Sequence, residues 1–313
     1  MISPDNSTGK EMKPDMDRKQ ADQITEALEY KRLNFWAEIW RDFKKNKGAM
    51  IGLFTFIVII AITILSEFLF DYDTQVIATS TADMLQSPSG GHLFGTDQYG
   101  RDILIRVLYG ARYSLLIGIC SVFVSVLVGS TLGIIAGYFG GLMETIIMRT
   151  MDVFSPIPSI LLAVCLTTAF GQGLGVLMFS IGLVSVPSFA QVARASVLTI
   201  RDQEFIEAAR ASGAREYQII LSHVLPNALS PILVQSTLRV AVAIVTASAL
   251  SFLGLGVPPP MPEWGGMLSD GRSFIRDYSY MTLFPGLAIM VTVLSINMVG
   301  DGLRDAMDPR LKR

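Results

Sequence analysis

Long stretches of the chain contain no Asp, Glu, Lys or Arg, and their lengths suit helices that cross a membrane. No Asp, Glu, Lys or Arg occurs in residues 48–66, 113–143, 153–193, 240–262 or 278–300. These stretches hold 19, 31, 41, 23 and 23 residues, and a helix needs about 20 apolar residues to span a bilayer. The pattern predicts an all-α, polytopic membrane protein.

The 41-residue stretch has room for two spans, because residues 171–175 read Gly-Gln-Gly-Leu-Gly and divide it. The expected number of transmembrane helices is therefore six. Four glycines in the second span are small enough to let neighbouring helices approach closely in lipid. The predicted spans are Ala49–Phe70, Tyr113–Phe139, Val153–Phe170, Leu174–Ala193, Pro226–Phe252 and Tyr280–Gly300.

The placement of Lys and Arg predicts the orientation of these spans. Six spans put both termini on one side of the membrane. That side holds nineteen of the 25 basic residues, in the two tails and in the connections 140–152 and 194–225, whereas five lie opposite and Arg239 lies within a span. Because cytoplasmic segments are enriched in Lys and Arg, we expect both termini to be cytoplasmic.

Residues 24–47 have the periodicity of an amphipathic helix. Leu33, Trp36, Trp40 and Phe43 form an apolar stripe, with six Lys and Arg residues around it. This pattern suits a helix that lies in the inner membrane interface and contacts anionic lipid. The alternative is a charged flank that serves only to set topology.

Composition supports a membrane protein and narrows the chemistry. The chain is 51% hydrophobic and 17% charged, compared with about 25% charged residues in soluble domains. Its formal net charge of −2 gives no reason to expect a nucleic-acid partner. The two histidines and two cysteines lack the spacing of a zinc site, so we expect no bound metal.

The connection between the fourth and fifth spans carries helix signals of its own. Residues 199–227 read TIRDQEFIEAARASGAREYQIILSHVLPN. Thr199 and Asp202 have the spacing of an N-cap box, residues 203–212 suit a helix, and Gly213 suits the left-handed residue that follows a helix. A second short helix then leads back to the membrane. We expect a helix–glycine–helix protrusion at the mouth of the bundle.

Three motifs carry a resemblance to a known family. Glu207-Ala208-Ala209, followed by Gly213 and Leu225-Pro226, resembles the EAA loop of ABC-importer permeases, although His223 stands where that loop usually has Ile. Residues 92–102 (HLFGTDQYGRD) and 251–257 (SFLGLGV) agree with the same family. Over residues 35–310, the chain resembles the second permease subunit of a dipeptide, oligopeptide or nickel importer.

The resemblance implies a type I ABC-importer permease fold in the cell membrane. It implies a tail at 1–48 and a permease domain at 49–313, with a core at 112–305 and a segment at 199–226 that couples to an ATPase. The implied partners are a homologous second permease, two ABC ATPases, an extracytoplasmic solute-binding protein and membrane lipid. The residues assigned to ATPase coupling are Glu207, Ala208, Ala209, Gly213, Leu225 and Pro226. Physically, the two alanines allow a partner to approach closely, and Gly213 permits a sharp turn.

The chain lacks the means to bind ATP through a phosphate-binding loop. That motif requires a lysine after its second glycine, and no lysine occurs between Lys47 and Lys312. We therefore expect a non-catalytic subunit with no cofactor of its own, while ATP and Mg²⁺ bind to the partner ATPases. Di- and oligopeptides are the expected substrates, with nickel or another small solute as the alternative. A passive channel and an intramembrane enzyme fit the motifs less well.

Arg239 is the one charged residue near the middle of a predicted span. A charge at this depth costs several kcal/mol unless it faces protein or water, which makes the residue a functional candidate. Two roles remain open from the sequence: Arg239 lines the pathway, or it forms an ion pair with another helix or with the partner permease.

Overall fold

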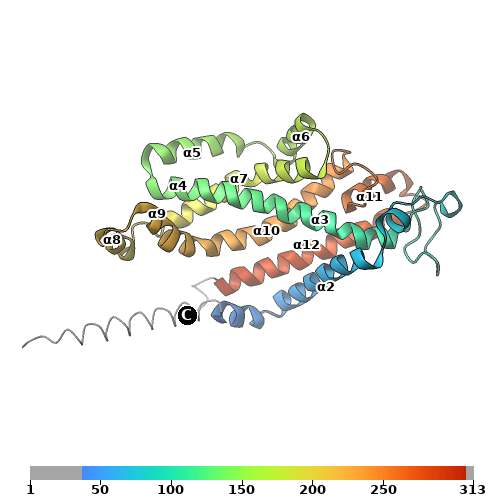
Figure 1. The fold of residues 1–313 in the computed structure, drawn as a ribbon, viewed down its shortest axis with the longest axis horizontal. Helices are drawn as coiled ribbons and strands as arrows, with labels where there is room; N and C mark the ends of the chain where they lie inside the picture. Colours follow the sequence, from blue (N-terminus) through green and yellow to red (C-terminus); the bar gives the residue numbers. More distant parts are fainter. Residues whose placement is uncertain (1–36, 308–313) are drawn as a thin grey trace, which may run out of the picture.

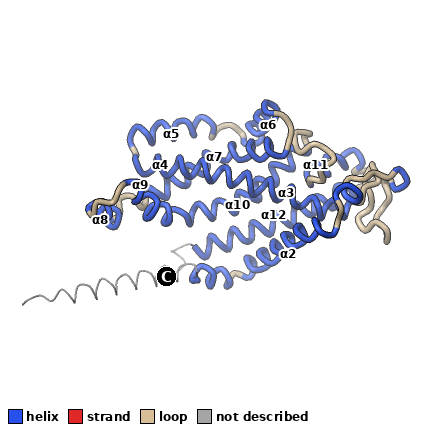
Figure 2. Tube along the Cα trace, viewed as in Figure 1, coloured by secondary structure: helices blue, strands red, loops and turns tan. Residues whose placement is uncertain are grey.

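The computed structural model describes residues 37–307 of the chain, and this part is mostly helical (Figure 2). Within residues 37–307 there is no β-strand, and one isolated antiparallel bridge joins Thr96 to Asp102. The predicted all-α class is confirmed.

Most helices run along the long axis of the molecule, as Figure 1 shows. Their bounds are α2 Lys47–Leu69, α3 Ile103–Ser125, α4 Thr131–Phe139, α5 Gly141–Phe154, α6 Ser159–Phe170, α7 Leu174–Leu198, α8 Glu204–Ala211, α9 Glu216–Ile219, α10 Leu225–Phe252, α11 Trp264–Gly271 and α12 Tyr280–Met307. Two π-helical segments, η3 (Val126–Ser130) and η4 (Ile220–Val224), join α3 to α4 and α9 to α10. Three further short helical segments are η1 (Tyr72–Val76), which is also π-helical, η2 (Thr81–Asp83) and η5 (Arg272–Phe274).

Five segments are long and apolar enough to cross a membrane, namely Lys47–Leu69, Ile103–Phe139, Leu174–Leu198, Glu216–Phe252 and Tyr280–Met307. The sixth candidate is the pair α5 and α6, whose axes are bent by 89°. The six predicted spans therefore correspond to five continuous segments and one broken pair. Each continuous segment contains most of the span predicted for it.

The third span differs from its prediction. Val153–Phe170 does not form one helix, because Pro156 and Pro158 lie at the break between α5 and α6. A residue that precedes proline is pushed away from helical geometry, and proline itself cannot donate a backbone hydrogen bond. The expected loop at 140–152 is also wrong, since most of this stretch belongs to α5 and packs against α4 and α7.

The close helix packing expected around the second span is present. A Cβ added to Gly133 would lie 2.2 Å from the carbonyl oxygen of Ala190, and one added to Gly129 would lie 2.6 Å from that of Val186. No side chain fits at such distances, so these two glycines let η3 and α4 lie directly against α7. The largest buried cluster is built around this contact and continues to α10.

Both ends of the described chain lie at the end of the bundle that carries α8 and α9 (Figure 1). Asn46 Nδ2 donates to Asp305 Oδ2 at 3.2 Å, and Phe43 packs in one cluster with Ala306. Residues 37–45 are helical, with Phe43 buried and Trp40 46% exposed. The rest of the predicted amphipathic stripe, Leu33 and Trp36, lies outside the described residues. The interfacial role of this helix and the cytoplasmic location of both termini remain predictions.

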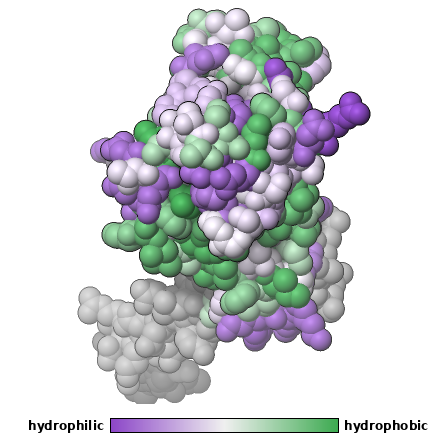
Figure 3. Space-filling model, turned by 90° about the vertical axis from the view of Figure 1, so that its right-hand side faces the viewer, coloured by the Kyte–Doolittle hydropathy of each residue, from purple (hydrophilic) through white to green (hydrophobic). Residues whose placement is uncertain are grey.

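The opposite end of the bundle carries α11 and the connection between α2 and α3 (Figure 1). Figure 3 views the molecule from this side and shows hydrophilic surface beside extensive hydrophobic surface. The helix α11 packs against α3, α10 and α12. In the connection between α2 and α3, Val76 is fully buried and its carbonyl oxygen accepts from Arg106 Nη1 at 3.0 Å, so both parts belong to the folded structure.

Candidate functional site

The segment between α7 and α10 holds four of the six residues assigned to coupling. Within α8, Ile206 is fully buried against the main core and anchors the helix. Ala209 is half-buried on the same side, whereas Glu207 and Ala208 are exposed. At this end of the bundle, the outward surface of α8 therefore includes the small side chain of Ala208 and the carboxylate of Glu207.

Gly213 has the predicted backbone geometry at the end of α8. Its φ is +82°, which a residue with a Cβ adopts only at a cost. Gly213 N donates to Arg210 O at 3.0 Å, and Ala214 N donates to Ala209 O at 3.2 Å. These two hydrogen bonds form a Schellman motif. A Cβ at Gly213 would meet no atom within 4 Å, so the backbone angle alone explains the need for glycine.

The predicted N-cap box at Thr199 and Asp202 is wrong, although the helix predicted for residues 203–212 is present as α8. Gln203 is the N-cap residue and makes no capping hydrogen bond through its side chain. Thr199 instead ends α7, and its Oγ1 donates to Ser196 O at 2.7 Å. The Thr199 and Asp202 pattern therefore occurs at the end of one helix rather than at the start of the next. The reason is that α7 extends beyond Ala193, its predicted last residue, as far as Leu198.

A polar contact fixes the protrusion to the end of α4. The Tyr138 hydroxyl donates to the Glu216 carboxylate at the first residue of α9. Arg210 contacts both groups: Nη2 donates to Tyr138 Oη at 3.3 Å, and Nε donates to Glu216 Oε1 at 3.3 Å. Arg201 Nη1 adds a bond to Gly137 O at 2.8 Å. These contacts give α8 a defined position relative to the bundle.

Leu225 and Pro226 are placed apart from the other coupling residues. They open α10 after the π-helical segment η4, and Pro226 is exposed in the first turn. Proline is tolerated there because the first N–H groups of a helix have no partner within it. Pro226 lies in the first turn of α10, as predicted, but the apolar span that contains it begins earlier, at Glu216, because α9, η4 and α10 are continuous.

Arg239 is half-buried on α10 and faces α7. Its Nη2 donates to Ser188 Oγ at 2.7 Å. Within residues 37–307, no carboxylate lies within the 4.0 Å of an ion pair with Arg239. An ion pair within the described part of this chain is therefore excluded, and the pathway role and a contact with a partner both stay predictions.

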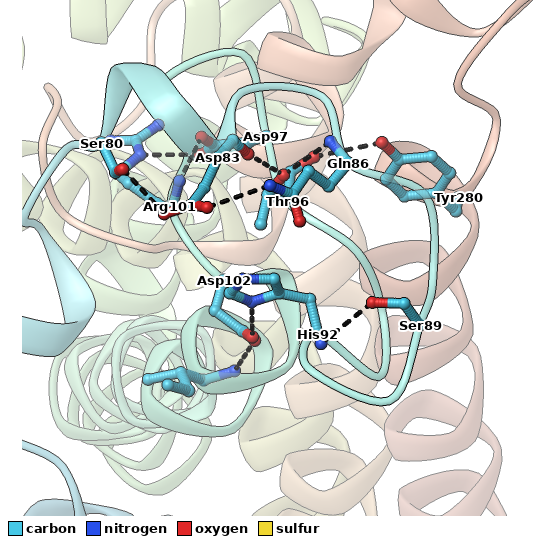
Figure 4. Close-up of polar contacts among 11 residues, drawn as sticks. Ser80, Asp83, Gln86, Ser89, His92, Thr96, Asp97, Arg101, Asp102 and Tyr280 are labelled. Carbon is cyan, nitrogen blue, oxygen red and sulfur yellow. Dashed lines mark hydrogen bonds and ion pairs between the residues drawn. The ribbon is translucent and has the colours of Figure 1, made fainter.

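At the other end of the bundle, residues 92–102 fold around a buried ion pair (Figure 4). Arg101 Nε donates to Asp97 Oδ2 at 2.6 Å, and the two side chains are only 5% and 8% exposed. Arg106 Nε lies 3.7 Å from the same carboxylate, and Arg101 Nη2 lies 3.6 Å from Asp270 Oδ2 on α11. The network ties α3 to α11. Burial raises the pKa of Asp270, while the two arginines oppose this shift.

The remaining side chains of this motif make structural contacts (Figure 4). His92 Nδ1 lies 2.8 Å from Asp102 Oδ2, and Asp102 Oδ1 caps α3 by accepting from Ile105 N at 3.1 Å. Tyr280 Oη donates to Thr96 O at 3.2 Å. Among residues 37–307, no group of three or more His, Cys, Asp or Glu side chains is placed to hold a metal ion.

Glu263 is a buried group that the sequence did not single out. The residue is 1% exposed, and its carboxylate accepts from Gly265 N at 2.9 Å and Gly266 N at 2.8 Å. Burial raises its pKa, although these N–H groups and the hydroxyls of Ser251 and Ser114 counter the shift. Its position just before Trp264, the first residue of α11, was the available signal, because negatively charged side chains are favoured at helix N-termini.

The helical bundle and its protruding helix–glycine–helix element fit the permease architecture that the motifs predict, and comparison with known proteins assigns the chain to the membrane permeases. The chain belongs to the family described as the binding-protein-dependent transport system inner membrane component, which matches residues 129–313. Residues 34–88 also match the N-terminal TM domain of oligopeptide transport permease C.

Several curated relatives cover nearly the whole chain. The dipeptide transport system permease protein DppC of Alkalihalophilus pseudofirmus is 45% identical, over 91% of this chain and 93% of that protein. The glutathione transport system permease protein GsiD of Pectobacterium atrosepticum is 42% identical, over 88% and 92%. The di/tripeptide transport system permease protein DppC of Pseudomonas aeruginosa is also 42% identical, with the same coverage.

A solved structure agrees with the fold. An inward-facing structure of the MetNI methionine ABC transporter aligns with a TM-score of 0.54 and 20% identity, and covers 65% of this chain and 97% of that one. At this identity the comparison supports the fold alone. The chain is a multi-pass membrane protein with an ABC-importer permease fold, and the resemblance found in its motifs is confirmed.

Proposed function

We propose that this chain is a non-catalytic permease subunit of an ATP-driven peptide importer in the cell membrane. With a homologous permease it forms the pathway for di- and oligopeptides. Three relatives named for dipeptides, di/tripeptides and glutathione support this substrate class. Two ATPases with bound ATP and Mg²⁺ act on one side, and a solute-binding protein delivers the peptide on the other.

The exposed face of α8 is the observation that carries the proposal. Ile206 and the contacts of Arg210 with Tyr138 and Glu216 hold α8 against the bundle, so its outward surface is presented at a fixed position. Ala208 on this surface leaves room for another protein to approach the helix backbone. When ATP closes the ATPases, the α8 helices of both permeases move together and the pathway opens outward. Hydrolysis then resets it.

The test is uptake by the reconstituted transporter. The chain is placed in proteoliposomes with its partner permease and ATPases, the binding protein is added outside, and uptake of labelled dialanine is measured with ATP inside. The proposal expects uptake that requires ATP and this subunit. Uptake of nickel without uptake of any peptide would contradict the peptide assignment and leave the importer architecture in place.

A further inference from the structure

A group of polar side chains lies between two apolar membrane segments, α7 and α10. Ser188 Oγ accepts from two donors on α10, Arg239 Nη2 at 2.7 Å and Gln235 Nε2 at 3.1 Å. All three residues are half-buried. An arginine within hydrocarbon almost always faces the bundle interior or a water-filled cavity, or pairs with another group, and it often marks a substrate pathway.

The polar group extends toward the broken span. Gln191 lies about one turn along α7 from Ser188, and its Nε2 donates to Ser155 Oγ at 3.3 Å, at the break between α5 and α6. Gln191 is exposed. Polar contacts thus link α7 both to α10 and to the break between α5 and α6.

Arg239 has unused capacity to bind an anion. A guanidinium carries five N–H donors in a planar fork, which matches a carboxylate through two parallel hydrogen bonds. In the part of the chain that the structure describes, the side chain donates one hydrogen bond, to neutral Ser188, and has no carboxylate within 4.0 Å. The positive charge is therefore not neutralised by any described residue of this chain.

Gln235 connects this group to a cavity of about 420 Å³ between α10 and α12. The cavity lies toward the end that carries α8 and has Arg304 in its wall, while none of its lining residues is acidic. Its volume is within the range of small-molecule sites, about 300–1,000 Å³. From mid-span toward the end that carries α8, the positively charged Arg239 is thus followed by the amide of Gln235, the cavity and a second positive charge, Arg304.

We propose that Arg239, Gln235 and Ser188 form a subsite for the C-terminal carboxylate of a peptide in transit, which then passes to the cavity at Arg304. This inference rests on the proposed function. A carboxylate of the partner permease is the competing occupant of the site. The cavity and the second cation favour a solute that moves, because a fixed ion pair at Arg239 has no need of either.

The experiment measures binding to the nucleotide-free complex of this chain with its partner permease and ATPases, in the absence of the solute-binding protein. The two probes are dialanine and its C-terminal amide, which differ only in the carboxylate. We expect dialanine to bind about tenfold more tightly or better, as charge-assisted hydrogen bonds allow. Arg239→Gln should bring the two affinities together, and Arg239→Lys should keep part of the difference. The control Arg276→Gln, exposed at the far end, should keep all of it.

Three outcomes would overturn the subsite. Arg239→Gln could retain the preference for dialanine, or it could lose the partner permease on purification, which assigns Arg239 to an ion pair between the subunits. ATP-dependent peptide uptake with no carboxylate preference in the unsubstituted complex would also overturn the subsite, while the proposed function stands. A complete transporter that takes up no peptide contradicts the proposed function itself.

Discussion

Arg101 and Asp97 form a buried ion pair with an Nε–Oδ2 distance of 2.6 Å, four residues apart at the start of α3. Asp97 also accepts from the backbone N–H groups of Tyr99 at 2.8 Å and of Arg101 at 3.0 Å. The Asp97 carboxylate therefore stabilises the turn and neutralises the buried Arg101.

Asp97→Ala should strongly destabilise the protein, because it leaves Arg101 and Arg106 without this counter-charge. Removal of one partner of a buried ion pair typically costs about 3–5 kcal/mol. The measurement is thermal unfolding of the purified protein in detergent. Asp73→Ala, an exposed carboxylate on the same side of the bundle, is the control and should change little. Equal unfolding temperatures for both variants would refute the structural role of Asp97.

The spans could be predicted because lipid tolerates few charges, so charge-free stretches mark most of α2, α3, α7, α10 and α12. The same rule failed to predict α5, because this helix contains the charged residues Glu144, Arg149 and Asp152. The structure explains one of these charges, since Arg194 Nε on α7 donates to Glu144 Oε1 at 2.6 Å. A pairing between residues so far apart in the sequence leaves no local pattern.

In the coupling segment too, features that depend on the local sequence could be predicted, whereas contacts between distant residues could not. Gly213 could be predicted because its conformation depends on its own backbone. The contact between Arg210 and Tyr138 joins residues 72 positions apart, and no sequence spacing indicates it. Ser188 was missed for this reason too, because a serine in a span acquires significance only from the arginine that it contacts.

Stability should fall as the pH rises above the ordinary value for Glu263. Burial raises the pKa of this carboxyl above 4.5. The folded protein therefore binds the proton more tightly than the unfolded chain, and its stability falls between pH 4.5 and the raised pKa. Glu263→Gln should flatten this part of the profile of unfolding temperature against pH. Glu67→Gln, with a side chain 57% exposed, should leave it unchanged; identical profiles for both variants would argue against the shift.

Cysteine labelling tests the predicted orientation. With Cys120 and Cys165 replaced by serine, Ile275→Cys should react with a membrane-impermeant maleimide in intact cells, since Ile275 is 60% exposed near α11. Lys10→Cys and Arg310→Cys should react only after permeabilisation, because the excess of Lys and Arg predicts cytoplasmic tails. Labelling of both tails in intact cells would contradict the prediction that the two termini are cytoplasmic.

Tyr138→Phe should loosen the protrusion without unfolding the bundle. The substitution removes a hydrogen bond to the charged Glu216, an interaction usually worth about 1.5–3 kcal/mol when the acceptor is ionised and less when it is partly exposed. Amide hydrogen exchange over residues 204–219 should accelerate severalfold, while exchange in α7 stays the same. Tyr217→Phe is the matched control, because that side chain is 54% exposed. Equal exchange in the two variants would show that Tyr138 does not hold α8.

Substitutions on α8 test its role in ATPase contact. The structure distinguishes two alanines: Ala208 faces outward, and Ala209 is half-buried against the core of its own chain. Ala208→Trp should therefore insert and fold normally, yet it fills the space that a partner needs. Overfilling a packed contact typically costs about 1–3 kcal/mol, which corresponds to at least a fivefold weaker association. Ala209→Trp should in addition lower the abundance of the permease itself.

The measurement for both variants is the ratio of ATPase to permease in detergent-extracted complexes, together with ATP-dependent uptake. Leu142→Trp is the control, because Leu142 is 77% exposed on α5 and the change adds the same ring away from α8. We expect this control to keep the ratio and the uptake, and Ala208→Trp to lose both at normal permease abundance. If Ala208→Trp behaves like the control, the exposed face of α8 is not the ATPase contact. The coupling surface must then lie elsewhere on this end of the bundle, and the mechanical part of the proposed function fails.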